Sequence, residues 1–118
     1  MREYVRFRIS FYCSTRAYWD VLRLHGLEDL GERLRPYPAA GRWDEMAALI
    51  PDDVLDLFAI VGRHDELAAR IAEKYEGLAD TLSLFIPTDT APGPLGEALA
   101  DIQRIPTPFQ GYELSWDR

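Results

Sequence analysis

Residues 51–87 contain three apolar elements separated by two glycines, and they constrain the fold more than any other part of the chain. The first two elements have apolar residues at helical spacing, which predicts amphipathic helices at 52–61 and 64–76. The third, at 81–86, is a short apolar run of residues that suit a strand, and Pro87 ends it because proline lacks the N–H that a sheet ladder needs. Helix, short loop and buried strand in this order are typical of half of a βαβ unit.

Five further segments carry apolar residues at helical spacing. Ser14 and Thr15 are good N-cap residues for the helix that follows them. The sequence PYPAAG at 36–41 is typical of a turn, because its prolines end the preceding helix. The helices predicted for the whole chain are 2–13, 15–25, 27–35, 42–50, 52–61, 64–76 and 94–105, with a strand at 81–86.

Residues 2–12 allow two interpretations. Val5, Phe7 and Ile9 alternate with polar residues, which by itself indicates a half-buried strand. In a helix, Val5, Ile9 and Tyr12 would form one apolar stripe instead. The sequence therefore predicts a single, mostly α-helical domain over residues 1–118 with one or two short strands, depending on this segment.

The charge balance excludes several classes of protein. The chain has a net charge of −7, which argues against nucleic acid as a partner, because phosphate binding needs a basic face. We interpret the acidic side chains as a solvated surface. No apolar run reaches the ~18 residues of a membrane span, and the first residues lack the features of a signal peptide. We therefore expect a cytoplasmic protein with no membrane contact.

Side chains with reactive groups fit structural roles better than catalytic ones. We interpret Cys13, the one cysteine of the sequence, as a buried core residue rather than a reactive thiol. His25 falls in the last turn of a predicted helix, where a cation is favourable, and this structural role outweighs a catalytic one. We interpret Trp43 as a packing anchor rather than a cofactor platform. Asp52 and Asp53 suit a helix start better than acid or base catalysis.

The helix predicted at 64–76 begins with three side chains that carry metal-binding groups. These residues, His64, Asp65 and Glu66, are adjacent and would point in different directions on a helix, which makes them a poor ligand set. Glu66 and Arg70 have the spacing of a favourable surface pair. No nucleophile elbow, P-loop, dinucleotide fingerprint or paired-cysteine spacing occurs in the sequence. We therefore assign no catalytic, cofactor-binding or metal-binding residue.

Five blocks in the chain carry a family resemblance: FYCSTRAYWDVLRLHG, GRWDEMAALI, DDVLDLFAIVG, DELAARIAEKY and DTLSLFIP. In this order they resemble the C-terminal portion of luciferase-like oxidoreductases, in particular the actinobacterial branch that uses the deazaflavin coenzyme F420. The resemblance spans residues 2–105 and favours helix for residues 2–12. It implies a TIM (β/α)8 barrel, and because such barrels need about 250 residues, this chain would form only a C-terminal fragment of one.

The resemblance also implies a function. The family consists of F420-dependent or flavin-dependent oxidoreductases and monooxygenases, so F420 or FMN is the implied coenzyme. Earlier segments of the barrel hold that coenzyme in the family, so we carry no coenzyme residue over to this chain and expect it to be inactive alone. Residues 88–94 would lie at the rim of the pocket. Arg63 and His64 replace a Thr-Pro cap of the family, which would weaken that helix start by about 1 kcal/mol.

The strand predicted at 81–86 would need neighbours, because a single strand has two unpaired edges and apolar side chains on both faces. The missing N-terminal barrel segment on another chain, or a second copy of this chain, would supply them. The N-terminal and C-terminal segments of this chain would also do so if they were strands. The alternative function is a non-catalytic helical interaction module or homodimer derived from the same family.

Overall fold

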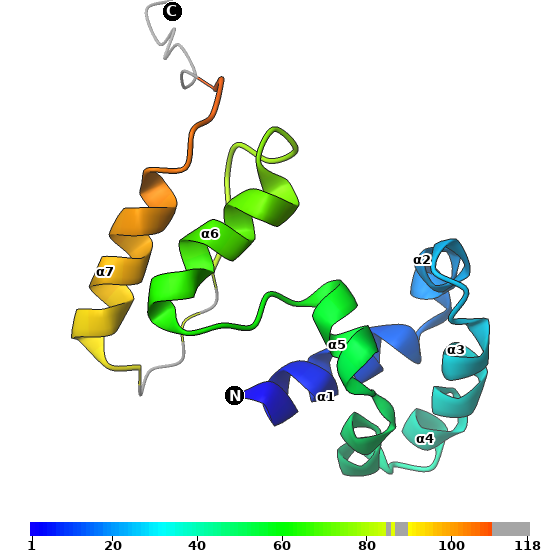
Figure 1. The fold of residues 1–118 in the computed structure, drawn as a ribbon. Coiled ribbons are helices and arrows are strands. Elements are labelled where there is room, and N and C mark those ends of the chain that lie inside the picture. The colour runs from blue at the N-terminus through cyan, green and yellow to red at the C-terminus, as the bar shows by residue number, and fades with distance from the viewer. Residues whose placement is uncertain (85, 87–89, 110–118) are drawn as a thin grey trace, which may run out of the picture. The chain divides into compact units, whose positions relative to one another are not determined.

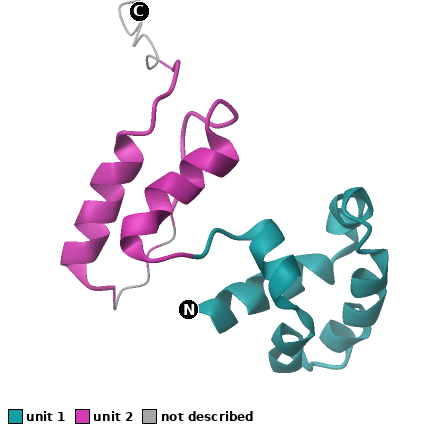
Figure 2. Cartoon of the chain, in the orientation of Figure 1, with its two compact units in different colours: residues 1–61 teal, residues 62–118 magenta. Residues whose placement is uncertain are grey.

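The computed structural model describes residues 1–84, 86 and 90–109, and all the regular secondary structure of these residues is helical (Figure 1). The chain forms two compact units, Met1–Val61 and Gly62–Arg118 (Figure 2). The main buried cluster draws all its side chains from residues 9–55, and therefore closes within the first unit.

The first unit is built from short helices and 3-10 turns. The segment for which the sequence allowed either a strand or a helix forms the helix α1. This helix buries Ile9 and Cys13, which lie one turn apart on the same face. The elements are α1 (Arg2–Cys13), η1 (Arg16–Tyr18), α2 (Trp19–Leu24), α3 (Glu28–Leu34), α4 (Pro36–Ala39), η2 (Trp43–Glu45), η3 (Ala47–Leu49) and α5 (Asp52–Phe58), where η marks a 3-10 turn.

Apolar side chains from most of these elements meet in one core. Helix α1 packs against η3, α3 and α5, and α2 packs against α3. Leu34, Met46 and Leu55 have no exposed surface. Because full burial of such a side chain stabilises a fold by roughly 1.5–3 kcal/mol, this core is the main source of stability of the unit. Its members are Ile9, Cys13, Leu22, Leu30, Leu34, Met46, Ile50, Val54 and Leu55.

Two predicted helices are divided in the structure. The hydroxyls of Ser14 and Thr15 donate to the Phe11 carbonyl at 2.7 and 3.1 Å, so these side chains cap the end of α1. Thr15 is also the N-cap residue of η1, but its side chain makes no capping hydrogen bond there. The segment predicted as a helix at 15–25 therefore contains η1 followed by α2. The segment predicted as a helix at 42–50 contains the two 3-10 turns η2 and η3.

Helix α4 occupies most of the segment that was predicted to be a turn. Pro36 is its first residue, a position where the missing N–H has no cost, because the first N–H groups of a helix have no partner within it. Pro36 therefore begins a short helix as well as following the end of α3. Helix α5 ends at Phe58, three residues before the end predicted for it.

The second unit contains two longer helices, α6 (His64–Tyr75) and α7 (Pro92–Gln103), which pack against each other. Ile71 of α6 and Ala98 of α7 are buried. The rim loop predicted at 88–94 lies partly outside the described residues, and its last part is already helical because α7 begins at Pro92.

The ends of α6 show how its backbone groups are satisfied. The Glu66 carboxylate accepts a hydrogen bond from the backbone N–H of Arg63 at 3.1 Å, which is one half of a capping box. This bond partly compensates for the capping hydroxyl whose absence the sequence indicated. After the helix, Gly77 has a φ of +75°, a conformation that glycine adopts without the steric cost of a side chain.

The prediction of a strand at 81–86 is wrong for those residues of the segment that the structure describes. Residues 81–84 and Ile86 have no regular secondary structure, and Phe85 lies outside the described residues. A strand requires a neighbour for its ladder hydrogen bonds, and the regular elements described in this unit are helices. The side chains of Leu82 and Leu84 are consequently exposed.

Gly31 allows α3 to approach α2 closely. A Cβ atom added at Gly31 would lie 2.9 Å from Leu22 Cδ1 and 3.3 Å from Trp19 Nε1. Leu22 belongs to the core and cannot move aside without disturbing its neighbours. The Nε1 group of Trp19 is buried here without a hydrogen-bond partner in the described part of the chain.

We expect Gly31→Ala to lower the free energy of unfolding by about 1–3 kcal/mol, because the added methyl group would overpack the contact with Leu22. The matched control is Gly96→Ala in α7, where an added Cβ meets nothing within 4 Å. That substitution should raise the free energy of unfolding by about 0.5–1 kcal/mol, the usual helix preference for alanine. Urea unfolding followed by circular dichroism measures both effects. A Gly31→Ala variant as stable as the parent chain would contradict the overpacking argument.

Candidate functional site

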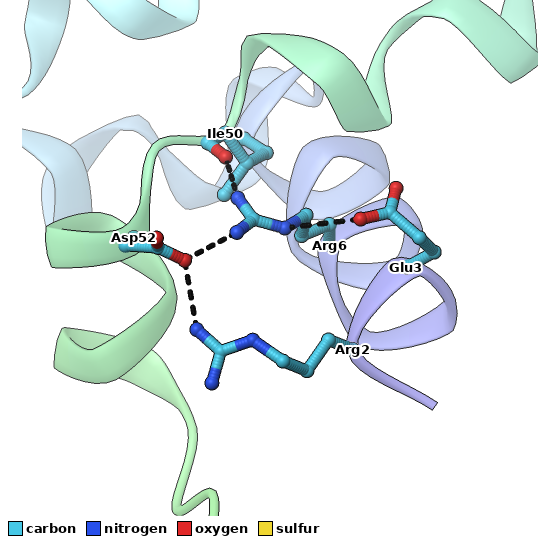
Figure 3. Close-up of polar contacts among 5 residues, drawn as sticks. All are labelled: Arg2, Glu3, Arg6, Ile50 and Asp52. Carbon is cyan, nitrogen blue, oxygen red and sulfur yellow. Dashed lines mark hydrogen bonds and ion pairs between the residues drawn. The ribbon is translucent and has the colours of Figure 1, made fainter.

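The most extensive polar cluster of the first unit joins α1 to the start of α5 (Figure 3). The guanidinium of Arg2 donates to Asp52 Oδ1 at 2.7 Å. The guanidinium of Arg6 donates to the same oxygen and to the Ile50 carbonyl. Glu3 lies on the other side of Arg6, with its Oε1 3.4 Å from Arg6 Nε. Two arginines one turn apart on α1 therefore hold the residues that begin α5.

The arginines change the acidity of Asp52. The hydrogen bond from Arg2, together with the charge and hydrogen bond of Arg6, lowers the pKa of the Asp52 carboxyl below its ordinary value of 3.8. A carboxylate that is stabilised in this way is a weak base near neutral pH, so it is poorly suited to accept a proton from a substrate. The cluster is therefore a tie between two helices.

The sequence anticipated only part of this cluster. Asp52 and Asp53 lie in the first turn of α5, as expected. The helix dipole stabilises carboxylates at this position. The contact with Arg2 and Arg6 was missed, because these residues lie 50 and 46 positions away in the sequence. The spacing of the two arginines on one helix face was an available signal, but only the packing of α1 against α5 identifies their partner.

Cys13 and His25 have the structural settings that their sequence positions favoured. Cys13 is buried in the core, and burial raises the pKa of its thiol from 9.0 to about 11. It is therefore a neutral thiol at physiological pH and not an activated nucleophile. His25 follows the last residue of α2, and its ring lies edge-on to the ring of Phe58, with 5.4 Å between their centroids.

Three further residues singled out in the sequence are engaged in local contacts. Trp43 stacks on Phe11 with 5.8 Å between ring centroids. Asp65 pairs with Arg63 at 3.1 Å, and Glu66 forms the predicted pair with Arg70 at 3.3 Å. Within residues 1–84, 86 and 90–109, no group of three or more His, Cys, Asp or Glu side chains is arranged to hold a metal ion.

A hollow of about 380 Å³ in the second unit is the candidate binding site. It lies beside α6 and α7, and the segment between these helices contributes to its wall. The Thr107 hydroxyl donates to Asp80 Oδ1 at 2.6 Å and ties the end of the chain after α7 to this segment. The lining residues are Ile71, Tyr75, Glu76, Ala79, Asp80, Thr81, Leu82, Leu84, Leu99, Ile102, Gln103, Ile105, Pro106 and Thr107.

The lining decides which molecules this hollow could accept. Its volume suits a small molecule, and most of its described side chains are apolar. The charged groups among them are the carboxylates of Glu76 and Asp80, which would repel the phosphate of a flavin or deazaflavin coenzyme. The residues of this hollow therefore do not fit such a coenzyme. The sequence did not predict the hollow, although the apolar stripes of α6 and α7 were visible in it.

The helices of the described chain are also too short or too polar to cross a membrane.

Comparison with known proteins identifies the class to which the chain belongs. Residues 1–81 match the luciferase-like monooxygenase family, and the chain is a member of that family. The matched residues run from α1 through α6, so they include the core of the first unit and the tie at Asp52.

Three mycobacterial proteins are similar to the chain. They are the uncharacterized proteins Rv1360 and MT1405 of Mycobacterium tuberculosis and Mb1395 of Mycobacterium bovis, each 40% identical over 82 residues. The match covers 69% of this chain and 24% of each relative, so the chain spans about a quarter of their length. No solved structure shows a significant match.

We expect Asp52→Asn to lower the free energy of unfolding at neutral pH more than Asp53→Asn, its matched control in the same helix turn. Because folding lowers the pKa of Asp52, its contribution is present above the ordinary value of 3.8 and is lost as the pH falls through the lowered value. The excess effect of Asp52→Asn should therefore vanish in strong acid, and salt should weaken it, since the carboxylate is exposed. Urea unfolding across pH measures this, and an excess that persists in acid would contradict the role of charge.

We expect Cys13 to react slowly with a thiol reagent such as DTNB in the native protein and rapidly in urea. The thiol is buried and its raised pKa of about 11 leaves little thiolate at mildly alkaline pH. A Ser83→Cys variant supplies the matched control, because Ser83 is exposed and a cysteine there should react at once. Rapid stoichiometric labelling of Cys13 without denaturant would show that its surroundings open readily.

Proposed function

We propose that this chain is the C-terminal segment of a luciferase-like oxidoreductase or monooxygenase that depends on F420 or a flavin. The observation that carries the proposal is the family match over residues 1–81, together with relatives of which the chain spans about a quarter. In this proposal the other segments of the (β/α)8 barrel hold the coenzyme, and the assembled protein acts in the cytoplasm. Its reaction is hydride transfer between the coenzyme and an organic substrate, or flavin-based monooxygenation.

The described residues support a structural role for this segment within the assembled enzyme. The first unit has a complete apolar core of its own and can serve as helical support. In the second unit, the exposed side chains of Leu82, Leu84 and Ile86 are the type that barrel strands would cover. Burying them against an N-terminal barrel segment would remove apolar surface from water. The carboxylates of Glu76 and Asp80 are consistent with a coenzyme phosphate that is held elsewhere.

A second candidate function is a non-catalytic helical interaction module or homodimer derived from this family. The observation that favours it is the first unit, which forms a closed core from residues 9–55 and so does not need the rest of a barrel to fold. In that case the apolar residues of the second unit would be covered by a protein partner, and the coenzyme would have no part in its function.

We expect the purified chain to bind neither F420 nor FMN at micromolar concentration, and to bind coenzyme when co-expressed with the part of Rv1360 that lies outside the matched segment. Fluorescence titration measures binding, and light scattering on a sizing column measures assembly. Micromolar binding by the chain alone would overturn the proposal. A homogeneous, folded chain that binds neither coenzyme and does not assemble with the barrel portion would favour the interaction module.

The contribution of the apolar segment can be tested in the same experiment. Leu82→Glu combined with Leu84→Glu should prevent assembly with the barrel portion, because it places charges where strands would pack. The matched control is Leu24→Glu in the first unit, where the leucine is 82% exposed. Equal assembly of both variants would show that residues 82 and 84 do not form the contact.

A further inference from the structure

The hollow in the second unit lies where two helices end. Figure 1 shows α6 and α7 side by side, with the later residues of both helices at the same end of the unit. Tyr75 is the last residue of α6 and Gln103 the last residue of α7, and both contribute to the wall of the hollow. The C-terminal end of a helix carries a partial negative charge, because its last carbonyl groups have no partner within the helix. Both helix ends therefore favour a positive charge in the hollow.

Two side chains add full negative charges to the same wall. Glu76 follows the last residue of α6, Asp80 lies in the segment after it, and both residues are exposed. The Thr107 hydroxyl donates to Asp80 Oδ1 at 2.6 Å, and because an ionised carboxylate accepts several hydrogen bonds, Asp80 retains capacity for a second donor. The wall thus offers two carboxylates to a ligand.

The basic side chains next to the wall in the sequence do not balance this charge. Arg104 Nη1 lies 2.5 Å from Asp101 Oδ1, outside the hollow. The Lys74 ammonium lies over the ring of Tyr75, 6.0 Å from its centroid, and Lys74 is not part of the wall. Among the described residues that line the hollow there is no lysine, arginine or histidine, so the lining has a net negative charge.

The rest of the wall selects a cation that has an apolar body. The side chains of Ile71, Leu99 and Ile102 line the hollow together with those of other aliphatic residues, and apolar surface of this kind gains from covering hydrocarbon. The ring of Tyr75 also attracts an ammonium group through its negative face. A hydrated inorganic ion would use the carboxylates but gain nothing from the aliphatic side chains. An organic ammonium ion uses both parts of the wall.

We propose that this hollow binds a small organic ammonium ion with an apolar body, of the arylalkylamine type. The ammonium group donates hydrogen bonds to the carboxylates of Glu76 and Asp80, and such charge-assisted bonds are stronger than neutral ones. The hydrocarbon part lies against Ile71 and Leu99. A volume of about 380 Å³ is in the range of small-molecule sites.

This inference goes beyond the proposed function and does not depend on it. The site is built only from residues of the second unit, and its test contains neither coenzyme nor a barrel portion. If the test fails, the proposed function still stands, and a failure of coenzyme binding in the assembled protein would leave this site standing.

The experiment is a titration of the full chain with three probes that share one body and differ in charge. The probes are 4-phenylbutylamine, which is a cation at neutral pH, the neutral 4-phenylbutanol and the anion 4-phenylbutanoate. Chemical shifts of the backbone amides report both affinity and location. We expect the amine to bind more tightly than the alcohol, the anion to bind least, and the shifts to cluster at residues of the wall. Added salt should weaken binding of the amine, because the carboxylates are exposed.

Variants of the wall test the roles of charge and space separately. Glu76→Gln and Asp80→Asn should each raise the dissociation constant of the amine by about threefold, and the double variant by about tenfold, since each exposed ion pair contributes modestly. Asp80→Asn keeps an oxygen that can accept from Thr107. Ala79→Phe places a ring in the hollow without changing charge and should also weaken binding.

The matched control is Glu73→Gln, which removes an exposed carboxylate of α6 outside the wall and should leave the affinity unchanged. Circular dichroism verifies that each variant is folded. An alcohol that binds as tightly as the amine, or wall variants that bind the amine as tightly as the parent chain, would overturn the proposal. Shifts that fall outside the second unit, or no binding of the amine, would overturn it as well.

Discussion

Burial of one apolar cluster is the constraint on which the first unit depends, because its helices are too short to persist alone. Helix α1 has 12 residues, α2 has 6 and α3 has 7. Isolated helices shorter than about 12–15 residues are marginal in water, so these elements exist only while they share a core. The close approach at Gly31 matters for the same reason, since it brings α2 and α3 onto that core.

Most of the ion pairs join charged side chains that are close together in the sequence. Pairs such as Asp20 with Arg23 and Asp101 with Arg104 join residues three positions apart on one turn and are exposed. Such pairs contribute little to stability, because water and salt screen them. Asp52 differs, since its two arginine partners come from α1 and the contact therefore carries tertiary information. It fixes where α5 begins relative to α1.

The two units differ in how completely they bury their apolar side chains. The first closes a core of nine buried side chains, while the second buries Ile71 and Ala98 and leaves Leu78, Leu82 and Leu84 exposed. Covering such an exposed apolar segment with an apolar partner lowers the free energy, because it removes apolar surface from water. The first unit therefore has a core of its own, whereas the apolar side chains of the second unit favour contact with a further apolar surface.

The sequence by itself determined the helical class, the stripes that form the core, the family, and the local roles of Cys13 and Asp52. These follow from residue spacing and from chemistry within one turn, which the sequence displays directly. Only the tertiary structure decided that 81–84 form no strand, that Asp52 binds Arg2 and Arg6, and that the ring of Trp43 stacks on Phe11. Strand pairing, long-range ion pairs and surface patches each require two segments to meet in space, and the spacing along one segment does not specify its partner.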